Sequence, residues 1–189
     1  MTVTLSQISD RMRDCRRCDL CDGRTNIVFG VGDPHARVML IGEAPGKNED
    51  LKGEPFVGAA GKLLDELLGE AGLRRSEVFI ANILKCRPPG NRDPRPPEIE
   101  ACTDYLRDQV RAVHPDILVT LGNFSTKFIL KTEQGITRLH GTINQTGRFT
   151  VLPMYHPAAA LYDPTKREVL VEDFRLLGKI VSSWYGGQG

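Results

Sequence analysis

Short apolar runs alternate with helical stripes of apolar residues along most of the chain. Four apolar runs predict buried strands, at residues 37–42, 78–83, 116–122 and 149–154. Each run ends at or near Gly, Asn or Pro, residues that interrupt strands. This alternation predicts an α/β fold, in which strands and helices take turns along the chain.

Amphipathic stripes with helical spacing lie between and after these runs. Their apolar residues recur every three or four positions, as in a helix that buries one face. The stripes are Leu63, Leu64, Leu67, Leu68 and Ala71; Ile99, Cys102, Leu106, Val110 and Val113; and Leu170, Phe174, Leu177, Val181 and Trp184. We expect a three-layer α/β/α sandwich with a central, mainly parallel four-stranded sheet. The tail GGQG after Tyr185 is expected to be loose.

Composition is that of an ordinary globular protein. The 189 residues are 40% hydrophobic and 26% charged, and the formal net charge is +1. We expect one domain over residues 1–189, because no repeat or long linker divides the chain. The net charge neither demands nor excludes a nucleic acid, so any basic footprint must be local. Without a signal sequence or a run of about 18 apolar residues, we expect a cytoplasmic protein that does not enter a membrane.

Five cysteines in a reducing compartment favour a metal site or buried packing over disulfides. Cys15 and Cys18 form a C-x2-C pair, whereas Cys86 and Cys102 lie far downstream. Sets of four cysteines hold either zinc or an iron-sulfur cluster. The spacing alone leaves both groups open.

The loops after the expected strands carry much of the polar chemistry. In such folds the ligand binds beyond the carboxyl ends of the strands. Glu43, Glu49 and Phe56 lie in a glycine-rich loop after the first strand, Asn82 is at the end of the second, and His156 follows the fourth. Each residue alone has a structural explanation, such as helix capping, a turn or core packing. Their convergence on one edge of the sheet favours a ligand site.

Several long motifs resemble the iron-sulfur uracil-DNA glycosylases known as family 4. The motifs are Cys15-x2-Cys18, GRTNIVFGVGDP, GEAPGKNEDLKGEPFVGAAGKLLD, NILKCRPPGNRDP, LGN and MYHPAAAL, and they run nearly the whole chain. The resemblance implies a monofunctional DNA glycosylase of base excision repair. Such an enzyme flips uracil out of DNA, hydrolyses its N-glycosidic bond and leaves an abasic site.

The resemblance also implies a 4Fe-4S cluster held by Cys15, Cys18, Cys86 and Cys102. The cluster would fasten the N-terminal segment and the proline-rich loop to the domain, since the hydrolysis needs no electron transfer. Cys21 falls outside the family set, although the C-x2-C-x2-C spacing leaves a swap open. Zinc is the chemical alternative to the cluster.

Roles for the pocket residues follow from the same resemblance. Glu43 and His156 are the expected catalytic residues: His156 donates to O2 of the departing uracil, and Glu43 holds or activates the attacking water. Asn82 would bind N3–H and O4 of uracil, and Phe56 would stack on the base. Further substrate-binding residues are Gly42, Ala44, Gly46 and Glu49.

The attacking water could be held by a carboxylate other than Glu43. A related family places its water-binding aspartate where this chain has Ala44. The carboxylate that activates water is therefore either Glu43 or Glu49.

We expect the loops at the carboxyl ends of the strands to bind uracil-containing DNA, either single- or double-stranded. Uracil is the expected product. Candidates for phosphate contacts are Lys85, Arg87, Arg92 and Arg95. Leu161 or Tyr162 could fill the gap left by the flipped base, and His140 is a further candidate for touching substrate.

We expect the protein to be a monomer. Its expected location is the cytoplasm of a prokaryote, in association with the nucleoid. An alternative from a different functional class is a non-catalytic iron-sulfur protein on the same fold. Such a protein would bind nucleic acid or transfer electrons.

Overall fold

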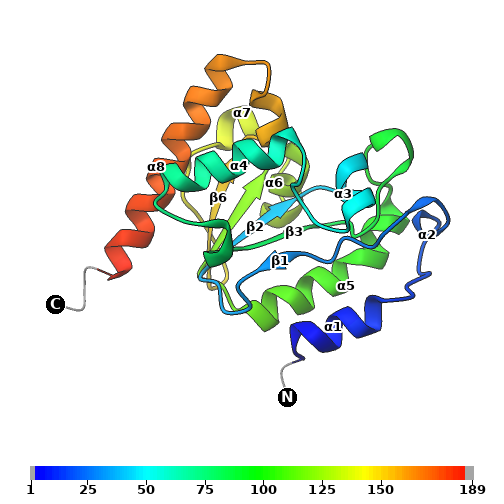
Figure 1. Cartoon of the computed structure of the whole chain (residues 1–189). Helices are drawn as coiled ribbons and strands as arrows, with labels where there is room; N and C mark the ends of the chain where they lie inside the picture. Colours follow the sequence, from blue (N-terminus) through cyan, green and yellow to red (C-terminus); the bar gives the residue numbers. More distant parts are fainter. Residues whose placement is uncertain (1–2, 186–189) are drawn as a thin grey trace.

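The computed structural model describes residues 3–185 and has a central sheet with helices on both faces (Figure 1). Its strands are β1 (Val31–Gly32), β2 (Val38–Gly42), β3 (Phe79–Asn82), β4 (Ile117–Leu121), β5 (Asn144–Thr146) and β6 (Phe149–Met154). They form one sheet in the order β1-β3-β2-β4-β6-β5. The four central strands are parallel, which confirms the expected α/β architecture. The expectation for the GGQG tail lies outside the described residues.

The sheet has two more strands than the four expected. β1 pairs antiparallel with β3, and β5 pairs antiparallel with β6. These strands are only two and three residues long, and none of their residues is fully buried. An edge strand of this kind needs no apolar run, because it adds backbone hydrogen bonds to one neighbour without crossing the core. The apolar pattern therefore could not identify them.

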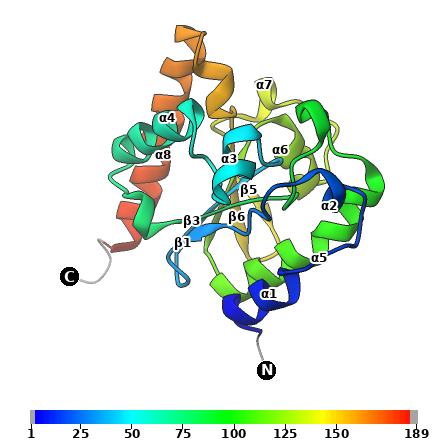
Figure 2. The same ribbon diagram turned by 45° about the vertical axis from the view of Figure 1, so that its right-hand side comes forward.

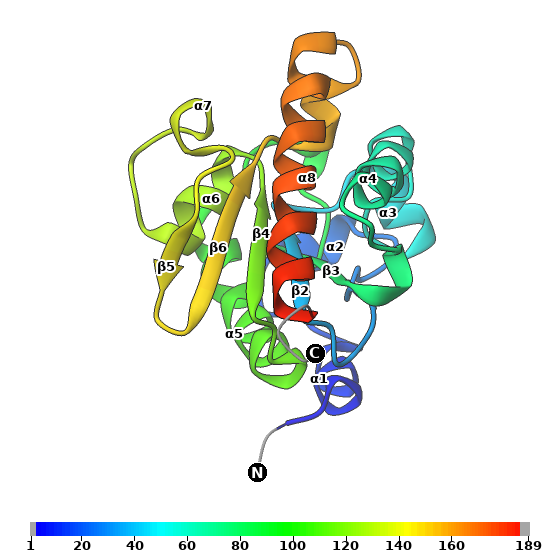
Figure 3. The ribbon, with the colours of Figure 1, turned by 90° about the vertical axis from the view of Figure 1, so that its left-hand side faces the viewer.

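Two helical layers enclose the sheet, with α4 and α8 on one face and α5 and α6 on the other (Figure 3). The helices are α1 (Leu5–Met12), α2 (Leu20–Gly23), α3 (Lys47–Lys52), α4 (Ala59–Glu70), α5 (Pro96–Val113), α6 (Asn123–Leu130), α7 (Ile136–Leu139) and α8 (Pro164–Tyr185). Three short 3-10 turns are η1 (Arg75–Glu77), η2 (Pro89–Asn91) and η3 (Pro157–Ala160). In the described part of the chain, no helix has the length and apolar character needed to cross a membrane.

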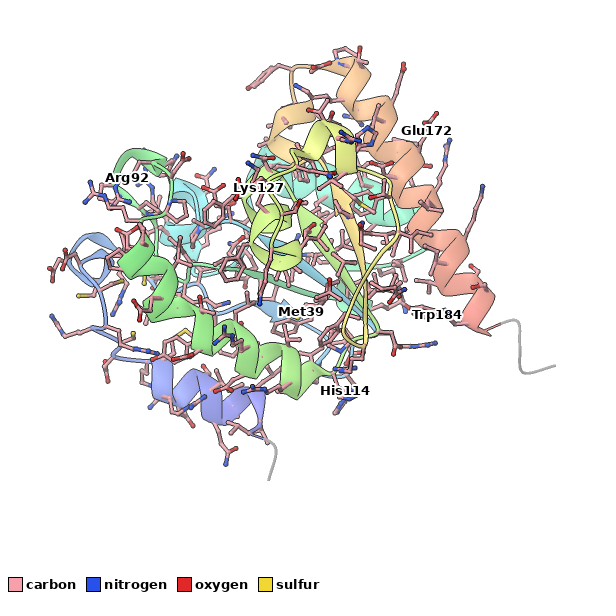
Figure 4. All side chains as sticks on the ribbon, turned by 180° about the vertical axis from the view of Figure 1, so that it is seen from behind. Met39, Arg92, His114, Lys127, Glu172 and Trp184 are labelled. Atoms are coloured by element: carbon pink, nitrogen blue, oxygen red, sulfur yellow. The ribbon has the colours of Figure 1, made fainter. Side chains whose placement is uncertain are left out.

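Successive residues of a strand face opposite sides of the sheet, so each central strand contributes to two cores. Val38 and Leu40 of β2 pack with α4 and α8, whereas Met39 and Ile41 pack with α5. Met39 is labelled in Figure 4. All four side chains are buried. Strands that are buried on both faces need near-continuous apolar runs, which explains why the sequence identified them.

Parallel pairing brings the carboxyl ends of β2, β3, β4 and β6 to one edge of the sheet. The loops that leave this edge gather together: α3 lies beside the loop between β3 and α5 in both Figures 1 and 2. Short α2, from the N-terminal segment, lies near the same loop. Segments distant in sequence thereby form a common surface at this edge.

Candidate active site

A pocket of about 400 Å³ opens at the carboxyl ends of the central strands. Loops after β2, β3 and β6 supply its walls. The lining residues are Glu43, Ala44, Pro45, Gly46, Glu49, Phe56, Ala60, Asn82, Pro88, Asn91, Arg92, His156 and Ala158. The structure thus brings together seven of the eight residues expected to bind or transform a substrate, and their roles stay predictions. The eighth, Gly42, lies against two of the lining side chains.

Gly42 leaves space for the side chains of Asn82 and Phe56. A Cβ atom at this position would overlap with Oδ1 of Asn82 and come within 3.0 Å of the Phe56 ring. Asn82 is only 3% exposed, and its side-chain amide has no hydrogen-bond partner among residues 3–185. No side-chain nitrogen or oxygen atom of these residues is both fully buried and unpaired. The amide of Asn82 therefore borders the open pocket.

Phe56 adopts a backbone conformation that is rare for an aromatic residue. Its φ of 52° lies in the left-handed region, where strained residues cluster at functional sites. Gly61 permits the turn, because a Cβ atom there would overlap with the carbonyl oxygen of Phe56. The Phe56 ring stacks against His156, with centroids 5.3 Å apart and planes at 24°. Its orientation in the pocket is thereby fixed from both sides.

The two glutamates of the pocket differ in their surroundings. Glu49 accepts a hydrogen bond from the backbone N–H of Val57 at 3.2 Å. Glu43 is half-buried, and its carboxylate has no hydrogen-bond partner in the described residues. Burial, and to a lesser extent the nearby charge of Asp93, raises the pKa of Glu43 above its usual range. Glu43 is therefore the less constrained carboxylate, and its raised pKa suits it to accept a proton.

His156 has a defined tautomer. Its Nδ1 accepts a hydrogen bond from the backbone N–H of Ala158 at 3.1 Å, so the proton of the neutral ring is on Nε2. Burial lowers the pKa of His156 to about 4, although the charge of Glu49 opposes this shift. The ring is consequently neutral at pH 7 and presents an N–H donor.

Four of the five cysteines line a second, smaller cavity. Its walls include Cys15, Cys18, Cys86 and Cys102, which come from the N-terminal segment, the loop after β3 and α5. Within residues 3–185, no three cysteine, histidine or carboxylate side chains are arranged to hold a single metal ion. Cys21 lies outside the cavity lining, and its thiol contacts the carboxylate of Asp22 at 3.5 Å.

The surroundings of these thiols are apolar but include two cations. Burial raises the pKa of Cys86 to about 11 and also raises that of Cys102. Arg24 donates to the sulfur of Cys86 at 3.4 Å and to the carbonyl oxygen of Cys15 at 2.8 Å. Lys85 lines the same cavity. Four thiols beside two cations suit a group with net negative charge.

The expectation that Lys85 contacts phosphate is wrong. This side chain is 1% exposed, and its ammonium group donates to oxygens inside the protein. Arg92 (labelled in Figure 4) borders the pocket and is held by the buried carboxylate of Glu98, while Arg95 is exposed. Arg87 donates to the side-chain oxygen of Asn91 at 2.7 Å.

The loop candidates also have distinct positions. Tyr162 is 94% exposed, whereas Leu161 is half-buried against the core under α4 and α8. His140 lies outside the pocket lining: its Nδ1 is 3.1 Å from the carboxylate of Asp173, and its ring stacks on Tyr155. The described contacts thus tie His140 to α8 and leave Tyr162 free to meet a ligand.

Two residues that shape these sites were not identified from the sequence. Gly61 is one of several glycines in GEPFVGAAG, and only the close approach of Phe56 shows its importance. Arg24 lies within the GRTN motif, which was a signal of the family but not of a contact with Cys86. Both effects depend on segments that meet only in the folded chain.

Comparison with known proteins gives a consistent picture. The family model described as the uracil DNA glycosylase superfamily matches residues 29–177. The chain is 48% identical to the type-4 uracil-DNA glycosylase of Archaeoglobus fulgidus, over 94% of this chain and 93% of that protein. It is 48% identical to the type-4 enzyme of Saccharolobus solfataricus (95% and 87% covered) and 41% identical to that of Thermotoga maritima (88% and 88%).

The desolvation of the His156 ring predicts how the ring titrates. We expect an NMR titration of the folded protein to give His156 a pKa of about 4, with the neutral ring protonated on Nε2. Because an unfolded histidine has a pKa near 6.5, the unfolded state binds the proton first on acidification. His156 should therefore lower the free energy of unfolding as the pH falls from 6.5 towards 4.

The matched control is His156→Asn, whose side-chain oxygen can still accept from Ala158. This variant should lose the assigned resonance and show a weaker pH dependence of stability in that window. A midpoint for His156 near its ordinary value of 6.5 would contradict the description of the ring as buried and neutral.

Proposed function

The chain belongs to the uracil-DNA glycosylase superfamily, and we propose that its pocket receives a uracil flipped out of DNA for hydrolysis by Glu43 and His156. The chain is a uracil-DNA glycosylase, a hydrolase that acts on N-glycosyl bonds in DNA repair. The observation that carries the residue assignment is the side-chain amide of Asn82, which has no partner among the described residues. It borders a pocket shared with a strained aromatic residue, a carboxylate and a neutral imidazole.

Asn82 and Phe56 recognise the base. The side-chain amide of Asn82 can accept from N3–H and donate to O4 of uracil, whereas cytosine presents the opposite pattern. A site that leaves buried polar groups unpaired with the wrong base discriminates strongly against it. The ring of Phe56 offers a surface on which a planar base can stack. Gly42, Ala44, Gly46 and Glu49 complete the wall around the base.

His156 stabilises the leaving group. When the bond between C1′ and N1 breaks, its electron pair stays with uracil and gives O2 negative charge. The Nε2–H of His156 donates a hydrogen bond to O2, and the neutral ring keeps its proton throughout. The bond from Ala158 to Nδ1 fixes the tautomer that this task requires.

Glu43 prepares the water. The oxygen of water bonds to C1′ as the bond to uracil breaks, and Glu43 accepts the proton that water loses. Its raised pKa makes it a stronger base than an ordinary glutamate. As a carboxylate near the sugar it also favours the positive charge that develops at C1′. Glu49 is the second choice, because one of its oxygens is already bonded to Val57.

The reaction ends with an abasic site. A glycosylase that also cuts the strand uses an amine to attack C1′, and no lysine is among the residues that line the described pocket. Lys85 is close in sequence to Asn82, but its ammonium group is buried and engaged. We therefore assign a monofunctional hydrolase that releases uracil and leaves the backbone intact.

DNA is held around the mouth of the pocket. Tyr162 is exposed in the loop after η3 and suits insertion into the base stack where the flipped nucleotide has left. Arg87 and Arg95 remain candidates for phosphate contacts, which carry affinity without reading sequence. The substrate is uracil-containing DNA, and either a single or a double strand can supply the extruded nucleotide to a protein that acts as a monomer.

Cys15, Cys18, Cys86 and Cys102 suit a 4Fe-4S cluster. They line a common cavity, and sets of four cysteine thiolates hold such clusters. Arg24 and Lys85 offset the negative charge that four thiolates contribute. The cluster would tie the N-terminal segment to the end of β3 and to α5, and it supplies this brace rather than a chemical step.

A uracil-containing oligonucleotide tests the assignment directly. After incubation with the protein, alkali should cut the strand at the uracil position, while the strand stays intact without alkali. Glu43→Gln should slow this reaction by about 10²- to 10⁴-fold, because the proton acceptor is lost. His156→Asn should slow it by about 10²- to 10³-fold, because the oxyanion donor is lost while the cap to Ala158 is kept.

Glu54→Gln is the matched control, since Glu54 is an exposed carboxylate just after α3, the helix that carries Glu49. Its rate should equal that of the unaltered protein. Intact strands with every substrate would point instead to a non-catalytic nucleic-acid-binding or electron-transfer protein. Full activity of Glu43→Gln would transfer the role of water activation to Glu49.

The cysteine set predicts a clear contrast between two serine variants. Cys86→Ser should lose most of the iron and the visible absorbance of anaerobically purified protein, because one of four thiolates is missing. Cys21→Ser should keep both, since Cys21 lies outside the cavity. Zinc in place of iron in the unaltered protein would overturn the cluster, and iron loss in Cys21→Ser would overturn the ligand set.

A further inference from the structure

Lys85 is among the largest fully buried side chains of the protein. Its ammonium group donates to the backbone oxygen of Asn82 at 2.7 Å, to Oε1 of Gln109 at 2.6 Å and to the backbone oxygen of Phe29 at 3.4 Å. None of these acceptors is a carboxylate. Burying an ammonium group among neutral oxygens is costly, because the charge loses its water. Stability alone is therefore a poor reason for a lysine here.

The acceptors show what the charge holds in place. Asn82 ends β3, and its side-chain amide borders the uracil pocket. The residues that follow are fixed by backbone bonds across to the β2 loop, from Ile83 to Gly42 and from Leu84 to Glu43, each of 3.0 Å. The carbonyl of Asn82 points the other way and receives the ammonium group of Lys85. The peptide that carries the reading side chain is thus held from both sides.

Lys85 also borders the cavity that the four cysteines line. It lines the cavity bordered by Cys86 and Cys102, and it is the residue directly before Cys86. One side chain therefore connects the cysteine cavity to the backbone that presents Asn82.

We propose that Lys85 is a positioning residue for base recognition: its ammonium group holds the carbonyl of Asn82 so that the side-chain amide stays aimed at uracil. This inference rests on the proposed role of Asn82. The free energy of burying the charge is then used to preorganise the pocket before the base arrives. A mobile Asn82 amide would instead have to be ordered by each incoming uracil.

Gln109 provides a matched control. It is fully buried on α5, accepts from Lys85 and donates to the backbone oxygen of Phe29 at 2.8 Å. Removing Gln109 breaks two buried hydrogen bonds but leaves the bond between Lys85 and Asn82. Removing the charge of Lys85 breaks that bond as well. The two changes therefore disturb the same buried network and differ at Asn82.

The experiment compares Lys85→Met with Gln109→Met. Methionine has nearly the shape of lysine without the ammonium group, so both variants keep an unbranched buried side chain. Binding of free uracil is measured by calorimetry, and steady-state rates are measured on a uracil-containing oligonucleotide. Circular dichroism and iron content establish that each variant is folded and carries its cluster.

We expect Lys85→Met to weaken uracil binding by about tenfold and Gln109→Met by less than about twofold. Lys85→Met should also raise KM more than it lowers kcat, because it affects the reading of the base and not the water or the leaving group. Equal effects of the two variants, or unchanged binding in Lys85→Met, would reduce Lys85 to a structural residue. Selective iron loss in Lys85→Met would assign it to the cysteine site instead.

Measurements of uracil binding and release by the unaltered protein distinguish a failure of this inference from a failure of the proposed function. If it releases uracil and only the contrast between the two variants is missing, the positioning role alone is wrong. If it neither binds nor releases uracil, the proposed function is wrong, and the inference is wrong with it.

Discussion

The side chains of Asn82 and Phe56 pack directly against Gly42. They occupy the space that the side chain of any other residue at position 42 would need. This close approach at the ends of β2 and β3 governs the rest of the site. Phe56 reaches it only through a left-handed backbone conformation, and Gly61 must lack a side chain for that turn to form. His156 then stacks on the Phe56 ring, and its cap to Ala158 determines which nitrogen carries the proton. The pocket is therefore built before a ligand arrives, as a site that reads a base by hydrogen bonds requires.

The cysteine cavity and the base pocket are neighbours along the chain. Three residues lie between Asn82 and Cys86, and Lys85, whose ammonium group is buried, is one of them. The proposed cluster would secure the N-terminal segment, the loop after β3 and α5 to one another. Under this proposal, a group with no chemical step in hydrolysis matters for a glycosylase because the segment it would hold presents Asn82, the side chain proposed to read uracil.

The sequence was most informative where its pattern reflects local physics. Central strands such as β2 are buried on both faces, so their apolar runs revealed them, whereas β1 and β5 bury no whole side chain and stayed invisible. The clustering of Glu43, Asn82 and His156 was predictable from the ends of parallel strands. Lys85 was misassigned, because a lysine in a polar loop is usually exposed and only the fold shows its three oxygen acceptors. The tautomer of His156 likewise depends on a backbone N–H that sequence cannot place.

The central claim is that the lack of a side chain at Gly42 allows Asn82 and Phe56 to form a pocket that recognises uracil. Binding of free uracil to the Gly42→Ala variant tests this claim most directly. The added methyl group would displace Asn82, so we expect binding to weaken by about 100-fold, the cost of two hydrogen bonds, with fold and iron content retained. Gly69→Ala, whose methyl group would meet no atom within 4 Å, should bind as the unaltered protein does. Equal binding by Gly42→Ala and the unaltered protein would contradict the account.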